Sequence, residues 1–456
     1  IPGHQIAEMA LVRLYMVTGD KKYLDQAKFF LDARGTTARK DIYLQSHKPV
    51  LEQDEAVGHA VRAGYMYSGM ADVAAITGDS SYVRAIDRIW ENIVGKKIYI
   101  TGGIGARHEG EAFGDNYELP NLTAYNETCA AIGNVYTNYR LFLLHGDAKY
   151  FDVLERTLYN GLISGVSLDG GRFFYPNPLA CDGKYRFNAD HTITRQPWFG
   201  CACCPSNISR FIPSLPGYVY AVKDDKVYVN LFLSNRAKLK VNGKNVVLEQ
   251  ETSYPWNGDI RLTVAKGNQP FVMNVRIPGW VRGSVLPGGL YSYADGEELA
   301  YRVSVNGQEV KGALQKGYLS IDRRWKKGDV VEIHFDMQPR VVKANDKVAA
   351  DRGRVAIECG PLVYCAEWPD NDFDISTLLL NRHPKFQVVE HPDLLGGINE
   401  ITTRAQALSY DATGRLAAKD VKLTLIPYYA WAHRGEGRME VWLPIEVGAA
   451  SAELQE

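Results

Sequence analysis

The segment Leu14-Tyr-Met-Val-Thr-Gly-Asp-Lys-Lys-Tyr-Leu24 has two further copies downstream, Ala74-Ala-Ile-Thr-Gly-Asp-Ser-Ser-Tyr-Val83 and Phe142-Leu-Leu-His-Gly-Asp-Ala-Lys-Tyr-Phe151. Each copy lies where one helical pattern ends and another starts. The glycine suits the left-handed position that ends a helix, and the aspartate after it caps the next helix. The interval between copies is long enough for a helical hairpin and a connecting loop. The sequence therefore predicts stacked αα-hairpins.

Helical hairpins that recur in this way commonly close into a toroid. We therefore expect an α+β multidomain protein whose residues 1–219 form an (α/α)6-barrel catalytic domain, incomplete at its N-terminus. About six helices are expected before Gly161, roughly half of such a barrel. The rest is expected partly after Cys203 and mainly before Ile1, because the chain opens without an initiator Met. The cellular compartment, bacterial cytoplasm or periplasm, is left open.

The hydrophobic pattern changes to a period of two after Pro213-Ser-Leu-Pro-Gly217. Alternating segments such as residues 226–233 and 329–335 are typical of strands. They predict one β-sandwich domain over residues 220–341 and a second over residues 342–456. Strands of the second domain are expected around residues 355–364, 422–426 and 439–443. The stretch 368–395, rich in Pro and Asp, is expected to be a surface excursion.

Composition excludes several classes of partner. Of the 456 residues, 46% are apolar and 23% are charged, as in ordinary globular proteins. The net charge of −1 lacks the basic excess of a nucleic-acid binder or of a protein bound to an anionic membrane. No apolar run is long enough to span a membrane. We therefore expect neither a nucleic-acid nor a membrane partner, and a homodimer is a possible assembly.

The cysteines favour a metal site over a disulfide framework. Three of the seven lie within four residues, at Cys201-Ala-Cys203-Cys204. Upstream, Glu127-Thr-Cys129 places a carboxylate and a thiol near one end of a predicted helix. One carboxylate and three thiolates would complete a tetrahedral zinc shell. The zinc could be structural, clamping a loop to the barrel, or catalytic.

Glu111 favours the catalytic interpretation, because it adds a further acid in a glycine-rich loop upstream of Glu127. Zinc keeps a bound thiol deprotonated, and a thiolate is a nucleophile. A metal-bound cysteine that faces a glutamic acid has the groups needed for covalent double displacement at a sugar. This role predicts a raised pKa for Glu111, since a general acid must hold its proton.

Other polar and aromatic candidates are less specific. His59 falls on the apolar face of a predicted helix, where a satisfied core histidine is the simpler interpretation. Asp54 and Glu55 are expected in the first turn of the same helix. Tyr125 and Tyr175 could contact a sugar or pack in the core, and spacing does not separate these alternatives.

Several motifs together resemble glycoside hydrolase family 127, a family of zinc-dependent β-L-arabinofuranosidases. The strongest are Gly110-Glu-Ala-Phe113, Tyr125-Asn-Glu-Thr-Cys129 and Cys201-Ala-Cys-Cys-Pro205, with Glu55-Ala-Val-Gly-His59-Ala-Val-Arg62 and Arg276-Ile-Pro-Gly-Trp280 in support. The resemblance covers nearly the whole chain. It implies an (α/α)6 barrel followed by two β-sandwiches, with the N-terminal part of the barrel lacking here.

By this resemblance, Cys203 would be the nucleophile and Glu111 the general acid/base. Zn²⁺ would be held by Glu127, Cys129, Cys203 and Cys204. The positions of His59, Tyr175 and His4 match residues that contact the sugar. The implied reaction is a retaining release of terminal β-L-arabinofuranose from plant glycans or glycoproteins.

Two alternatives keep a carbohydrate as the partner. One is a hydrolase of aceric acid or another acidic sugar in pectin side chains, for which Arg107 or Arg195 would be expected at the pocket mouth. The other is a non-catalytic carbohydrate-binding protein with a structural zinc.

Overall fold

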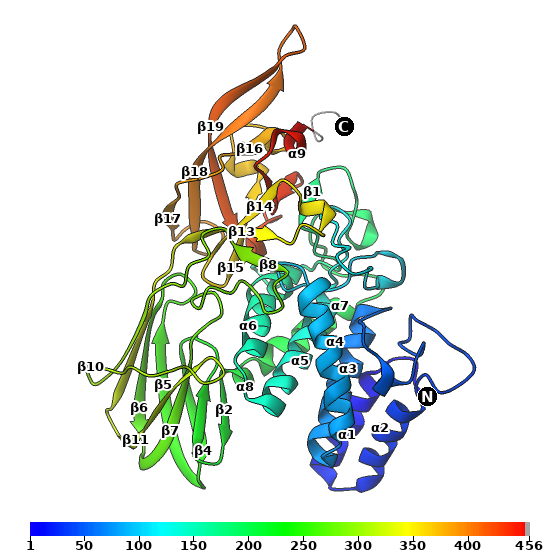
Figure 1. The fold of residues 1–456 in the computed structure, drawn as a ribbon, viewed down its shortest axis with the longest axis vertical. Helices are drawn as coiled ribbons and strands as arrows, with labels where there is room; N and C mark the ends of the chain where they lie inside the picture. The colour runs from blue at the N-terminus through cyan, green and yellow to red at the C-terminus, as the bar shows by residue number, and fades with distance from the viewer. Residues whose placement is uncertain (452–456) are drawn as a thin grey trace.

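The computed structural model describes residues 1–451, and its N-terminal half is helical (Figure 1). The helices before residue 160 pair as predicted, and they are α1 (Ile6–Thr18), α2 (Lys21–Ala33), α3 (Ala60–Thr77), α4 (Ser80–Lys96), α5 (Thr128–His145) and α6 (Lys149–Arg156). Gly19, Gly78 and Gly146 end α1, α3 and α5 in the left-handed conformation. Asp20 and Asp79 cap the helices that follow. The repeat is therefore a helical-hairpin turn, as predicted.

The pair α3 and α5 lies at the centre of the helical part. Almost every residue of α3 up to Ala74 is buried, and α5 is buried to a similar extent. The two helices approach closely at Gly64 and Gly133, where a Cβ on Gly64 would lie 3.1 Å from the Gly133 backbone. The shorter helices α7 (Cys203–Phe211) and α8 (Pro216–Val219) complete this part. They lead into the strands.

The middle part consists of two sheets, where the sequence predicted one β-sandwich domain. One sheet has the strand order β10-β9-β12-β6-β5-β4, and the other has the order β11-β7-β3-β2. Their bounds are β2 (Tyr220–Lys223), β3 (Lys226–Val229), β4 (Asn235–Val241), β5 (Lys244–Thr252), β6 (Asp259–Lys266), β7 (Asn268–Arg276), β9 (Tyr301–Val305), β10 (Gln308–Glu309), β11 (Tyr318–Lys326) and β12 (Val330–Phe335). The inward-facing side chains alternate along β6 and β12, as a half-buried sheet requires.

In the C-terminal part, for which a second sandwich was predicted, the strands are hydrogen-bonded into one branched sheet of 11 strands. This sheet contains β13 (Pro339–Ala344), β14 (Arg354–Cys359), β15 (Leu362–Glu367), β16 (Leu378–Leu380), β17 (Gln387–His391), β18 (Ile398–Tyr410), β19 (Leu416–Pro427), β20 (Arg438–Glu440) and β21 (Leu443–Pro444). It also takes in β1 (Ala180–Asp182) and β8 (Tyr291–Tyr293), which pair with β20 and β13. The stretch 368–395 is not only a surface excursion, since it supplies β16 and β17. The last element, α9 (Val447–Ser451), is a short helix.

Buried ion pairs attach the helical part to both groups of strands. Arg276 at the end of β7 is fully buried and reaches Asp152 of α6 at 2.9 Å and Glu155 at 2.5 Å. Arg156, in the last turn of α6, contacts Glu358 of β14 at 2.6 Å. A helical part followed by strand-rich parts thus packs as one body, which confirms the coarse fold prediction. Within residues 1–451, no helix combines the length and apolar character needed to cross a membrane.

Candidate active site

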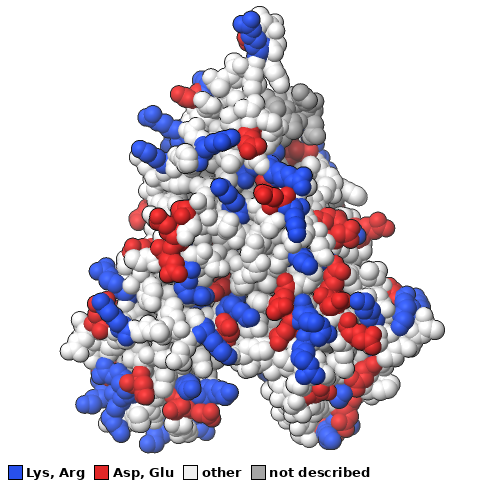
Figure 2. Space-filling view, in the orientation of Figure 1, with Lys and Arg blue, Asp and Glu red and all other residues white. Residues whose placement is uncertain are grey.

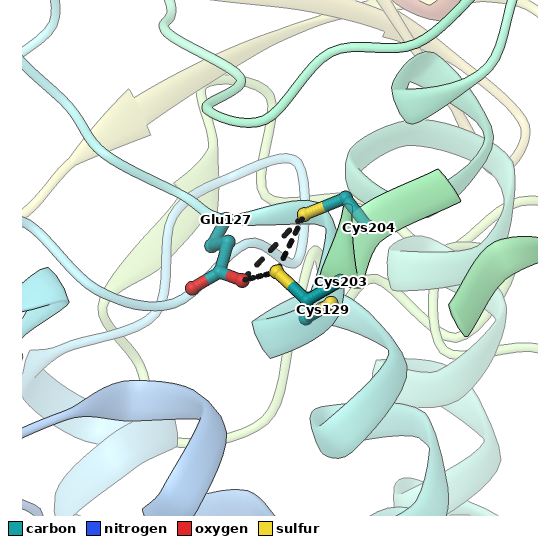
Figure 3. A group of neighbouring side chains, drawn as sticks. All are labelled: Glu127, Cys129, Cys203 and Cys204. Carbon is teal, nitrogen blue, oxygen red and sulfur yellow. Dashed lines mark hydrogen bonds between the residues drawn. The ribbon is translucent and has the colours of Figure 1, made fainter. Parts of the chain in front are cut away.

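The four predicted metal ligands come from the N-termini of two helices. Glu127 is the N-cap of α5, Cys129 lies in its first turn, and Cys203 and Cys204 begin α7. Their ligand atoms all lie within 4.8 Å of one another. Figure 3 shows Glu127 facing the two sulfurs of α7, each 3.5 Å from its Oε1 atom. The fold thus brings together residues separated by more than seventy positions in the chain.

Burial makes this cluster a plausible cation site. Glu127 is 2% exposed, and its Oε2 atom has no hydrogen-bond partner among the described residues. Leaving such an oxygen unpaired is costly unless another group satisfies it. One carboxylate and three sulfurs form a donor set that suits a tetrahedral metal ion. The residues present therefore fit a bound metal.

The pKa values within the cluster shift in different directions. Hydrogen bonds from Cys129 and Cys204, in that order, lower the pKa of Cys203 to about 2. Burial raises the pKa of Glu127 well above its usual value, and burial also raises the pKa of Cys204. Cys203 is also the partly exposed cysteine of the group, and it lines a cavity. A partly exposed thiolate is a nucleophile.

A second cluster surrounds Glu111. His59 Nε2 lies 2.8 Å from Glu111 Oε2, and the Tyr125 hydroxyl donates a hydrogen bond of 3.0 Å to Oε1. Glu111 ends a short turn in which both Gly110 and Glu111 have positive φ angles, 70° and 48°. The left-handed conformation costs little at glycine but is unusual for a glutamate, which is typical of functional positions.

His59 is the N-cap of α3, so the prediction that it lies on an apolar helix face is wrong. The helix begins only at Ala60, because Gly58 just before it has a φ of 69°, which a right-handed helix does not allow. Asp54 and Glu55 therefore precede the helix, and Glu55 instead pairs with Lys97 at 2.7 Å. His59 is 7% exposed, and its Nδ1 atom has no partner among residues 1–451. It is thus not a satisfied core histidine.

The pKa of Glu111 shifts opposite to the prediction. Burial alone would raise the pKa of this carboxyl. The hydrogen bond and charge of His59, followed by the hydrogen bond from Tyr125, outweigh burial and lower it. The sequence prediction was wrong because it considered desolvation and the nearby thiolate but not these two donors.

Tyr175 joins the two clusters. Its hydroxyl lies 3.1 Å from the Cys203 sulfur and 3.3 Å from Glu111 Oε1. It is also 3.9 Å from the sulfur of Cys201, which is exposed. A single hydroxyl therefore spans the space between a carboxyl group and a thiolate. Tyr175 is 8% exposed and cannot leave this position without repacking.

Both clusters open into a cavity of about 410 Å³. His4, Tyr175 and His59, the three residues predicted to contact the sugar, line it. Burial, followed by the charge of Arg62, lowers the pKa of His4 to about 4. The sequence interpretation assigned no role in the site to several other lining residues, which are Tyr43, Arg62, Tyr65, Cys201, Asn207 and Arg210. Arg62 could have been found, because it lies one helical turn after His59.

The two arginines expected at the pocket mouth lie elsewhere. Arg107 is held by Glu118, with its Nε 2.8 Å from Oε1. Arg195 is fully buried, and it donates hydrogen bonds to backbone carbonyls that include those of Ser164 and Trp431. That prediction is therefore wrong. The arginines that line the cavity are Arg62 and Arg210.

Three family models match the chain in succession. They are described as the GH127 catalytic domain of β-L-arabinofuranosidase over residues 1–217, the GH127 middle domain over residues 226–337, and the glycoside hydrolase family 127 C-terminal domain over residues 339–444. The chain belongs to glycoside hydrolase family 127. The resemblance found in the sequence motifs is thereby confirmed, and this GH127 chain is a glycoside hydrolase.

Three relatives match the GH127 chain along almost its whole length. A non-reducing end β-L-arabinofuranosidase of Bifidobacterium longum is 36% identical, and the match covers 96% of this chain and 70% of the relative. A solved GH127 β-arabinofuranosidase is 76% identical with a TM-score of 0.95, over 98% of this chain and 70% of that one. A GH127 β-L-arabinofuranosidase from Geobacillus stearothermophilus T6 is 40% identical with a TM-score of 0.89, over 97% of this chain and 72% of that one.

Proposed function

We propose that this chain is a retaining exo-glycosidase that releases terminal β-L-arabinofuranose through a cysteine nucleophile. The observation that carries the proposal is the Tyr175 hydroxyl, which lies within hydrogen-bonding distance of both Cys203 and Glu111. Retaining glycosidases place acid and nucleophile close together, about 5–5.5 Å apart for two carboxylates. The names of the relatives support arabinofuranose as the sugar.

The reaction has two displacements. In the first, the Cys203 thiolate attacks the anomeric carbon, the bond to the leaving oxygen breaks, and the Glu111 carboxyl gives that oxygen its proton. In the second, the Glu111 carboxylate takes a proton from water, whose oxygen attacks the anomeric carbon while the carbon–sulfur bond breaks. The sugar leaves with its original anomeric configuration, and Cys203 returns as a thiolate.

Zinc is the proposed metal, with Glu127, Cys129, Cys203 and Cys204 as its ligands. When bound, it would keep the thiols deprotonated and hold the sulfur of Cys203 in place. The unpaired Oε2 atom of Glu127 and the burial of the cluster support this assignment. His59, Tyr175 and His4 are proposed to bind sugar hydroxyls. Closure of the helices into an (α/α)6 barrel and domain boundaries near residues 219 and 341 also remain proposals.

A second candidate function is the hydrolysis of an acidic sugar. Arg62 and Arg210 line the cavity, and neither forms an ion pair within the part of the chain that the structure describes. Arg62 donates to the Gly3 carbonyl, and Arg210 donates to Asn207 Oδ1 at 2.6 Å. Two arginines without a carboxylate partner favour a substrate that carries one.

Mass spectrometry of the intact chain tests both candidates. The chain is incubated with a cyclophellitol-type mimic of β-L-arabinofuranose, and its zinc content is measured on the same sample. We expect one adduct on Cys203 and one bound zinc. In Cys203→Ser the adduct should disappear while zinc falls only in part. Cys181→Ser, which changes a buried thiol outside the cluster, should label like the original.

The alternatives predict other results. An adduct on a carboxylate, or unchanged labelling of Cys203→Ser, would contradict the cysteine mechanism. A structural zinc would make Cys129, Cys203 and Cys204 equally necessary for stability and Glu111→Gln neutral for turnover. If an arabinofuranoside is not cleaved but its carboxylated counterpart is, and Arg62→Met removes that activity, the acidic-sugar function holds.

A further inference from the structure

A second groove lies in the C-terminal sheet, and no residue of the catalytic cavity lines it. Its volume is about 1010 Å³, larger than that of the catalytic cavity. The groove runs over β18 and β19 and is bordered by the segment 381–387 between β16 and β17, both of which pair with β18. Figure 2 shows several Lys and Arg side chains over this part of the molecule, where Figure 1 places β17, β18 and β19.

Two like charges face each other at its centre. Arg404 of β18 and Lys422 of β19 are directly paired in the antiparallel register. Like charges in directly opposite positions destabilise a sheet. Both side chains are exposed, and neither forms an ion pair within residues 1–451. This pair of cations lowers the stability of the sheet at that point. Such locally unfavourable choices are expected at functional positions.

The segment 381–387 adds one further positive charge to the groove. Lys385 is exposed on it. Phe386, beside Lys385, packs against the hydrophobic core of the C-terminal sheet and so fixes the segment. Asn381 donates a hydrogen bond of 3.1 Å to the Arg404 carbonyl, which ties the same segment to β18. The positive side chains are therefore presented from a fixed backbone.

Acidic side chains do little to neutralise this groove. Among its lining residues Asp420 is the only acidic one, against the three cations Lys385, Arg404 and Lys422. The whole chain has a net charge of −1, so the local excess is not a general property of the protein. Glu400 also feels the charge of Lys422, but cations still outnumber carboxylates in the lining of the groove. An open groove with an excess of cations attracts a polyanion, and hydroxyl and amide side chains in its walls can bind sugar hydroxyls.

We propose that this groove binds a uronic-acid-bearing polysaccharide. Repeated carboxylates on an extended glycan match the row of cations across β18, β19 and the segment 381–387. A glycan is favoured over other polyanions because the chain is a glycoside hydrolase. The groove would hold the polymer while the distant cavity acts on its terminal sugar. This inference does not depend on which sugar the cavity cleaves.

The test compares the full chain with a double variant, Arg404→Thr/Lys422→Thr, in which threonine suits the strand positions. Binding to polygalacturonate and to neutral arabinan is measured by calorimetry at low and at physiological salt. Lys238→Thr/Lys240→Thr on β4 is the matched control, since it also removes two exposed positive charges from a strand.

We expect the unaltered chain to bind polygalacturonate at least tenfold more tightly than arabinan, with affinity falling as salt is added. The groove variant should bind at least tenfold more weakly, and the β4 variant should bind like the original. Both should hydrolyse a small neutral arabinofuranoside at the original rate, so failure of the catalytic proposal would be seen separately. Equal polygalacturonate binding by the groove variant and the original, or equal affinity of the original for arabinan or for single-stranded DNA, would overturn the proposal. Dissociation of a dimer by the groove variant would also overturn it and assign the surface to self-association.

Discussion

Replacing Tyr125 by Phe should raise the pKa of Glu111 and extend activity to higher pH. The Tyr125 hydroxyl donates a 3.0 Å hydrogen bond to Oε1 of Glu111. Its ring is 6% exposed and packs edge-on against His108 with centroids 5.1 Å apart, so phenylalanine preserves the packing. The hydrogen bond stabilises the charged carboxylate and contributes to the lowered pKa of Glu111.

The size of the shift follows from the energy of that bond. A hydrogen bond to a charged group contributes about 1.5–3 kcal/mol, and one pKa unit corresponds to about 1.36 kcal/mol, which gives about 1–2 units. The Glu111 side chain is 30% exposed, and water replaces part of what is lost, so we expect about 1 unit. The general acid must be protonated, hence kcat/KM falls as pH rises through this pKa. The basic limb of the profile should therefore move up by about 1 pH unit.

The assay is kcat/KM against pH with an aryl β-L-arabinofuranoside. Tyr67→Phe is the matched control, because Tyr67 is also buried but its hydroxyl has no partner among the residues the structure describes. The control should leave both limbs in place. A basic limb that stays fixed in Tyr125→Phe, or that moves to lower pH, would refute the assignment of this limb to Glu111.

Three further predictions concern stability. Arg276→Met should destabilise the fold by about 3–5 kcal/mol in urea titrations, because two buried carboxylates of α6 lose their partner; Arg261→Met, in an exposed pair, should change stability by less than about 0.5 kcal/mol. Burial lowers the pKa of His433 to about 4, whereas the unfolded chain takes up this proton near pH 6.5. The free energy of unfolding should therefore fall by about 1–2 kcal/mol as the pH is lowered from about 6.5 to about 4, allowing for partial exposure. His433→Asn should lose this pH dependence in unfolding measurements. Removing metal with a chelator should lower the melting temperature, and added zinc should restore it, because the buried cluster around Glu127 then lacks its cation.

Local signals explain why the helical part was predictable. A glycine that ends a helix and an aspartate that caps the next one act within a few residues, so Gly78 and Asp79 mark their turn without any tertiary information. Strand alternation is local in the same sense, and β6 and β12 lie where the pattern placed them. The cysteine and glutamate motifs could be found because their residue types are informative about chemistry even before their positions are known.

Long-range pairing explains what was missed. The pairing of β1 with β20 joins residues about 260 positions apart, and nothing local in Ala180–Asp182 indicates that partner. The same limit applies to Arg195, whose burial is set by carbonyls of residues 429–432. The direction of the Glu111 pKa shift likewise depends on His59 and Tyr125, which only the folded chain brings to its two oxygens.

The hairpin repeat and the active site lie at opposite ends of the same helices. His4 shortly precedes α1, His59 is the N-cap of α3, and Glu127 is the N-cap of α5. Each of these helices ends at a glycine of the repeat, and the paired helix returns towards the site. Because the repeat fixes the direction and length of α1, α3 and α5, their N-termini gather at one mouth, where α7 adds Cys203. Helix N-termini carry partial positive charge and favour a carboxylate or thiolate beside them. A structural repeat that contains none of the proposed site residues thus determines where Glu127 and Cys203 meet.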